Sequence, residues 1–174
     1  MRYTRMTNKA GFSLIEVMFS LAILLIVSGG LLSVFAAGDD TWQVNRTRIG
    51  LQQEARRAME NMIYDLRHAS SGSVVNVLAD GTAFTSITFR KPTNVTSGTL
   101  QWNGVDTVIA LSGTNLQKTE GNTMQVLARD VSAVTFTRTS TAPDILLVSL
   151  TTQRNTNEGV AVDYTLNFDV QLRN

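Results

Sequence analysis

The sequence has no cysteine, a single histidine and only two prolines among its 174 residues. Without cysteine, an exported domain must hold its core by packing alone, and thiol nucleophiles and cysteine zinc sites are excluded. No GxSxG, GxxxxGK or GxGxxG motif is present, so acyl transfer and nucleotide chemistry have no support. We expect a surface or capping role for the histidine, His68. A hydrolase that depends on His68 is the weaker alternative.

Oxygen ligands for a metal are also poorly organised in this sequence. Asp144, Asp163 and Asp169 could supply carboxylates to calcium, yet no DxDxDG-type spacing is present. Acids on the wet face of a strand are the ordinary explanation for such residues. The sequence therefore predicts no metal, no cofactor and no enzymatic activity.

Charge is sparse and unevenly distributed. Charged residues make up 17% of the chain, and the formal net charge is +1. The first eleven residues hold Arg2, Arg5 and Lys9 and no acid. Without them, 12 basic and 14 acidic side chains remain, a formal charge of −2. This balance predicts no basic surface for nucleic acid.

A long apolar segment follows the basic start. Val17 to Gly38 gives 22 residues without a charge, close to the ~20 residues that span a bilayer. The core of a cleaved export signal is shorter, roughly 7 to 15 residues, although Ala36 offers a small residue where a signal peptidase could cut. We favour a span that is kept. The basic leader then lies in the cytoplasm, with Asp39, Asp40 and the rest of the chain outside.

Glu16 lies at the start of this apolar segment. An ionisable group in a membrane costs on the order of 2.5 to 3.5 kcal/mol and marks function by default. A cut between Gly11 and Phe12 would place the new amino group of Phe12 four residues before Glu16, the spacing at which helix side chains face each other. Ser13 and Ser20 extend the acid into a narrow polar stripe. The acid could then pair with its own terminus or with that of a neighbour.

The residues Gly11 Phe12 Ser13 Leu14 Ile15 Glu16 resemble the processing and methylation motif of type IV prepilins and type II secretion pseudopilins. The resemblance implies cleavage after Gly11 by a prepilin peptidase and N-methylation of Phe12. It also implies that Glu16 draws the subunit into a filament, and that the basic leader residues Arg2, Arg5 and Lys9 are removed with the leader.

Residues 39 to 71 are expected to continue the helix with an amphipathic pattern. Their apolar stripe comprises Leu51, Ala55, Ala58, Met62, Leu66 and Ala69, with charged residues, Asp65 among them, on other faces. The following strands are the natural cover for this stripe, and Gly72 is expected to end the helix. The sequence from Gln53 to Ala69 resembles the corresponding segment of W-type minor pilins and J-type minor pseudopilins. Arg56, Arg57 and Arg67 are expected to be a solvated face.

From Val74 onward the period is two, and turn signals separate short apolar runs. A loop is expected at Pro92 to Gly98. The last strand is the clearest, with apolar residues at every second position from Val160 to Leu172. The predicted strands are Val74–Leu78, Ala83–Arg90, Thr99–Trp102, Thr107–Leu111, Asn115–Lys118, Met124–Ala128, Ala133–Arg138, Ile145–Thr151 and Val160–Leu172. We expect one meandering antiparallel sheet.

The sequence thus predicts an α+β, pilin-like fold, in which a long N-terminal helix packs on an antiparallel head. Its parts are a leader (1–11), a transmembrane and assembly helix (12–38), an amphipathic helix (39–72) and a β-rich head (73–174). The resemblance implies a minor pilin that initiates pilus assembly in a tip complex. A minor pseudopilin of a type II secretion system is the first alternative, and an anchored or secreted β-rich adhesin is the second.

The expected partners follow from the same resemblance. They are the prepilin peptidase, other minor subunits, the major subunit and the inner membrane, with no nucleic acid. The chain is expected to cross the inner membrane once, with its head in the periplasm, and then to enter a periplasmic or extracellular filament.

Overall fold

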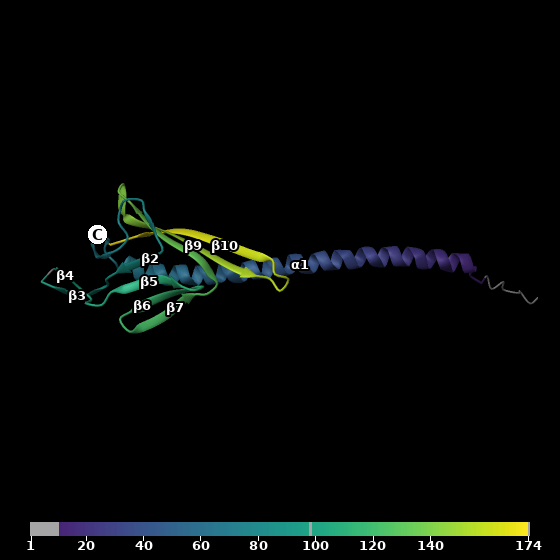
Figure 1. Ribbon diagram of the computed structural model, residues 1–174, viewed down its shortest axis with the longest axis horizontal. Helices are drawn as coiled ribbons and strands as arrows, with labels where there is room; N and C mark the ends of the chain where they lie inside the picture. Colours follow the sequence, from purple (N-terminus) through teal and green to yellow (C-terminus); the bar gives the residue numbers. More distant parts are fainter. Residues whose placement is uncertain (1–10, 98, 174) are drawn as a thin grey trace, which may run out of the picture. The chain divides into compact units, whose positions relative to one another are not determined.

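The computed structural model describes residues 11–97 and 99–173. Its contacts divide the chain into two compact units, one up to Trp42 and the other from Gln43 onward. A single helix, α1 (Leu14–Arg67), begins in the first unit and ends in the second (Figure 1). No proline lies between residues 14 and 67, so no backbone N–H is lost along its 54 residues.

The first unit consists of the apolar part of α1. An 18-residue window reaches a mean hydropathy of 2.4, and none of it is buried within the chain. Within the described residues, α1 is the one helix long and apolar enough to cross a membrane. Exposed apolar surface of this extent calls for a cover from lipid or from other protein chains.

In the second unit, the predicted apolar stripe of α1 is confirmed. Leu51, Ala55, Ala58, Met62 and Leu66 are fully buried, and Arg56, Arg57 and Arg67 are exposed as expected. The expected end of the helix at Gly72 is wrong, because α1 ends at Arg67. Gly72 instead lies in a short 3₁₀ turn, η1 (Ser71–Ser73), which the Ser70 side chain caps.

Ten strands follow in the described residues, all in antiparallel ladders, but they do not form the single meandering sheet that we predicted. One four-stranded sheet has the order β1-β8-β9-β10, another has the order β2-β5-β6-β7, and β3 and β4 form a separate hairpin. The strands are β1 (Ala83–Phe84), β2 (Ser86–Phe89), β3 (Pro92–Thr96), β4 (Thr99–Trp102), β5 (Thr107–Ser112), β6 (Asn115–Glu120), β7 (Thr123–Ala128), β8 (Val131–Thr139), β9 (Ala142–Asn155) and β10 (Ala161–Gln171).

Two predicted strands differ in the structure. Residues 74 to 78 form no strand and make a single bridge, between Val74 and Phe89. The Asn76 side chain takes over the role of a ladder there, since its Oδ1 accepts from Thr88 N at 2.7 Å and its Nδ2 donates to Ser86 O at 3.0 Å. The run from Ala83 to Arg90 is split into β1 and β2, which belong to different sheets. The chain therefore crosses from one sheet to the other between Phe84 and Ser86.

The expected loop at Pro92 to Gly98 is also wrong, because Pro92–Thr96 forms β3 and pairs with β4. Pro92 is the first residue of that strand, a position where proline is tolerated. Ser97 has a φ of 53° in the turn that follows. The hairpin thus places the turn at the end of the predicted loop.

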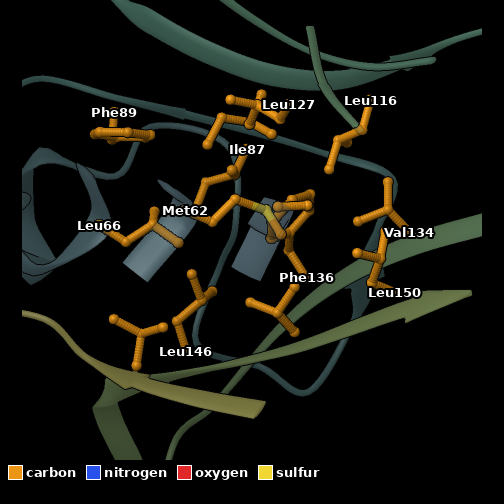
Figure 2. Packing of buried hydrophobic residues seen from close by; sticks show 14 of the residues in the cluster. Met62, Leu66, Ile87, Phe89, Leu116, Leu127, Val134, Phe136, Leu146 and Leu150 are labelled. Atoms are coloured by element: carbon orange, nitrogen blue, oxygen red, sulfur yellow. The ribbon is translucent and has the colours of Figure 1, made fainter. Parts of the chain in front are cut away.

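The core lies between the two larger sheets. Met62 and Leu66 of α1 lie between Ile87, Phe89 and Leu127 on one side and Leu146 on the other (Figure 2). The alternation predicted for the last strand is confirmed in β10, where odd-numbered residues are exposed and even-numbered ones are buried or half-buried. Both sheets therefore share one apolar core with the helix.

Candidate processing and assembly site

The start of α1 is defined by Ser13. Residues 11 to 13 are not helical, and the Ser13 carbonyl accepts from the N–H groups of Glu16 (3.1 Å) and Val17 (3.2 Å). The Ser13 hydroxyl also accepts from Glu16 N at 3.3 Å. Ser13 therefore caps the helix, and Glu16 lies in the first turn, where a carboxylate is favoured by the helix dipole.

Gly11 and Phe12 precede the cap, and both are exposed. Phe12 is 82% exposed, and a Cβ atom added at Gly11 would meet no atom of the described residues within 4 Å. Exposed segments outside regular structure are where proteolytic cleavage concentrates. The described residues place no packing constraint on a side chain at position 11.

Several hydroxyl groups along α1 donate hydrogen bonds to backbone carbonyls of the same helix. Ser20 Oγ donates to Glu16 O at 2.8 Å, four residues back. Ser33 does the same to Gly29 O at 3.1 Å, and Thr41 to Ala37 O at 2.9 Å. Back-bonding of this type satisfies hydroxyls on a helix that has no water around it. These residues are thereby compatible with an apolar environment.

The Glu16 carboxylate differs from these hydroxyls. Ser13 and Ser20 both bind backbone groups of Glu16, whereas no hydrogen bond or ion pair joins its carboxylate to the residues that the structure describes. An acid in an apolar helix needs a positive or hydrogen-bonding partner. The arrangement leaves this carboxylate available to a group from outside the described chain.

The remaining predicted residues are distributed as follows. Arg2, Arg5 and Lys9 lie outside the described residues. His68 lies just after α1, where its ring contacts Tyr64 with centroids 5.0 Å apart and its Nδ1 lies 2.7 Å from Tyr64 O. It has the exposed position that we predicted. In residues 11–97 and 99–173, no group of three or more His, Asp or Glu side chains could hold a metal.

Asp65 is a buried, charged residue whose position differs from the predicted one. Predicted to lie on a face of the helix other than the apolar stripe, it is only 4% exposed. Its Oδ2 accepts from Lys118 Nζ at 2.7 Å, and its Oδ1 lies 2.9 Å from Lys91 Nζ. Lys91 also bonds Glu120 at 3.0 Å. A signal was present, since position 65 is seven residues after Ala58 and three after Met62, on the apolar stripe.

The charges in this cluster shift one another's protonation. Burial opposes ionisation of Asp65, but hydrogen bonds from Lys118 and Lys91 outweigh it and hold the pKa of Asp65 below its ordinary value. Burial likewise opposes the charge on Lys91, yet Asp65 and Glu120 raise the pKa of Lys91. Asp65 and Lys91 therefore both favour their charged forms near neutral pH. The cluster joins α1 to β6, which is a structural role.

Comparison with known families matches the N-terminal part of the chain. Residues 6–32 match the model described as the prokaryotic N-terminal methylation motif. This match includes Gly11, Phe12 and Glu16, and it indicates the type IV pilin and pseudopilin class. No curated protein matches the chain significantly.

The fold agrees with that class, because one long N-terminal helix followed by antiparallel sheets is an α+β, pilin-like architecture. The motif implies processing by a prepilin peptidase and assembly with other pilins. Together with the apolar helix, it also indicates anchoring in a membrane. The class is one of structural subunits and not of enzymes.

Proposed function

We propose that this chain is a minor pilin, a subunit that helps to initiate assembly of a type IV pilus within a tip complex. The methylation motif at residues 6–32 is the observation that carries the proposal. Three features support a minor subunit over an abundant one. The head is large, α1 has no proline, and the absence of cysteine rules out a disulfide loop. The same features suit a minor pseudopilin.

The processing step takes place at Gly11 and Phe12. Hydrolysis of the peptide bond between them releases leader 1–11, with Arg2, Arg5 and Lys9, and leaves an amino group on Phe12. Transfer of a methyl group from a sulfonium donor to this nitrogen releases the donor's thioether and one proton, and the methylated amine keeps its positive charge. The exposed Phe12 and the open space at Gly11 support this assignment.

The new terminus and Glu16 then form the assembly site. In the mature chain the Phe12 amino group comes directly before the Ser13 cap, and Glu16 lies one helical turn later. A short distance and a low dielectric make such a charge pair strong. A Glu16 carboxylate without a described partner supports pairing with Phe12 of the same or a neighbouring subunit.

The chain's regions take their roles from this scheme. Residues 12–38 cross the inner membrane once, residues 39–72 link the span to the head, and residues 73–174 form the head in the periplasm. Assembly moves the apolar helix from lipid into a bundle of similar helices, so little hydrophobic free energy changes. Glu16, Phe12 and contacts of the head therefore decide which subunits assemble with one another.

Intact-mass measurement of the protein purified from its native membrane tests the proposal. We expect a chain that begins at N-methylated Phe12, and the unprocessed chain in cells that lack prepilin peptidase. A protein that starts at Ala37 would instead indicate ordinary signal cleavage and a secreted adhesin. A protein that retains residue 1 would indicate an uncleaved anchor.

A further inference from the structure

The strand β10 is a long, open edge. It pairs with β9 alone, over all eleven residues from Ala161 to Gln171 and without a register shift. It carries no proline, lysine or bulge, three of the devices that keep a sheet edge from pairing with another chain, and its charges are two acids, Asp163 and Asp169. An edge of this length presents a continuous row of backbone donors and acceptors.

Hydrogen bonds show which residues point outward. Even-numbered residues face β9, since Tyr164 O accepts from Thr152 Oγ1 and Leu172 N donates to Asp144 O. Arg173 faces the other way, with its N–H on Ala69 O at 2.9 Å and its carbonyl on Ser71 N at 3.1 Å. Because the direction alternates along a strand, the odd-numbered residues 161 to 171 turn their backbone groups to the open edge.

At its C-terminal end, this edge already pairs with another segment of the same chain. The bridge between Ser70 and Arg173 is parallel, and it closes the edge only at its last residue. The core-facing side chains in the middle of β10 are less buried than those toward its two ends. Tyr164, Leu166 and Phe168 are half-buried, whereas Val162 and Val170 toward the two ends are buried. An added strand with apolar residues on that face would cover them.

The outer face of the edge is acidic. Asp163 and Asp169 are both exposed, and the residues opposite them on β9 are Gln153 and Leu147, neither of which is basic. Opposite charges across a strand pair are favourable and like charges are not. A strand with Lys or Arg at the facing positions therefore complements this edge.

The same charges disfavour a second copy of β10. Antiparallel pairing of two copies along all eleven residues is centred on Leu166, and it places Asp163 of each copy opposite Asp169 of the other. β7, another strand at a sheet edge, carries no basic residue between Thr123 and Ala128. Neither β10 nor β7 of a second copy therefore supplies the required charge.

We propose that β10 is an assembly edge, to which a different subunit of the same filament adds a strand. The added strand has apolar residues toward Leu166 and Lys or Arg residues toward Asp163 and Asp169. Main-chain hydrogen bonds provide the affinity, and the two acids select the partner. The inference rests on the proposed role of the chain as a filament subunit.

Site-specific cross-linking in native cells tests this interface on the full chain. Because the chain has no cysteine, Asn167→Cys can carry a photoactivated label on the outward side of β10, and Ser149→Cys provides a control on the adjacent strand. We expect the label at 167 to capture an extended, basic segment of another pilin-type subunit, and the label at 149 to capture much less of it. Capture of a second copy of this chain, capture of lipid only, or equal yields at both positions would overturn the proposal.

Substitutions at Thr165 separate backbone pairing from side-chain effects. Thr165→Pro removes an outward N–H, whereas Thr165→Val keeps it and loses only the hydroxyl, which lies 3.0 Å from that of Thr151. We expect the cross-link at position 167 to fall about tenfold with proline and by less than about twofold with valine. Undiminished capture with the proline variant would contradict strand addition.

The double variant Asp163→Lys with Asp169→Lys tests the same interface without a proline. Both positions are exposed, so we expect the head to fold normally. The variant should reduce capture severalfold while the melting temperature stays near that of the wild type; unchanged capture would count against selection by charge. Cleavage at Phe12 is measured in the same samples. An unprocessed chain would refute the proposed function, whereas a processed and assembled chain without the cross-link would refute only the interface.

Discussion

The carboxylate of Asp65 lies 2.7 Å from the ammonium group of Lys118, although 53 residues separate them in the sequence. The contact joins the last turns of α1 to β6. Lys91, just before β3, completes the cluster at 2.9 Å from the same carboxylate. A buried acid with two lysines fixes how the helix lies on this sheet, because any shift would leave a charge without its partner.

Replacing Asp65 by Asn should lower the free energy of unfolding by about 1 to 3 kcal/mol. This range lies between the effect of an exposed pair and that of a fully buried one, since both lysines retain some exposure. Thermal unfolding of the detergent-solubilised full chain measures it. Asp106→Asn is the matched control, because its pair with Arg90 is about half exposed and should contribute less than about 1 kcal/mol. Equal losses in the two variants would contradict a special role for Asp65.

The same cluster predicts how stability depends on pH. The folded-state pKa of Asp65 is lowered, so its contribution is complete above the unfolded-state value, about 4, and is lost as pH falls below it. The pKa of Lys91 is raised, so its contribution is lost only as pH rises above about 10.4. Melting curves should show wild type and Asp65→Asn converging as the pH falls below the ordinary carboxyl pKa of about 4. A constant difference between them across the acid range would exclude this linkage.

Glu16→Ala should leave cleavage after Gly11 and membrane insertion intact and reduce incorporation into filaments about tenfold or more. The reason is that the Phe12 amino group would lose its carboxylate partner. Quantification in sheared filaments against the membrane pool measures the effect, and Glu16→Gln should behave like alanine if charge is what matters.

Ser20→Ala provides the control for that experiment. Its hydroxyl bonds only the Glu16 carbonyl in the described structure, so incorporation should remain close to that of the wild type. If Ser20→Ala and Glu16→Ala reduced incorporation alike, the polar stripe as a whole would be responsible instead of the carboxylate.

Met62→Ala should destabilise the head by about 2 to 5 kcal/mol, because it opens a cavity between the two larger sheets. Met59→Ala, on the half-buried border of the same stripe, should cost less than about 1.5 kcal/mol. Chemical unfolding of the two variants compares them directly. Similar losses would mean that the helix is not held in the register described.

Periodicity alone was enough to predict the helix stripe and the last strand. Leu51 to Leu66 repeat at helical spacing and β10 alternates at spacing two, and in both cases burial follows the pattern. These elements are long, and each has one face against the core. Local spacing therefore carries the information about which side chains are buried.

The partition into two sheets could not be read in the same way. Phe84 pairs with Phe136 and Ile87 with Ile109, so neighbours three residues apart in the chain join different sheets. Which strands pair depends on contacts far apart in sequence, and Asn76 replaces a strand by its side-chain amide. The Asp65 cluster was missed for a related reason, since its partners Lys91 and Lys118 are set by tertiary packing.

The core combines residues that are synthesised early with residues that are synthesised last. The helix stripe that ends at Ala69 is synthesised about a hundred residues before Val170 and Leu172, which complete the same cluster. Until the last strand is made, the stripe has no complete cover, and β9 has a partner only in β8. We therefore expect the core of the head to be completed only after β10 is synthesised, with apolar residues of the stripe uncovered until then.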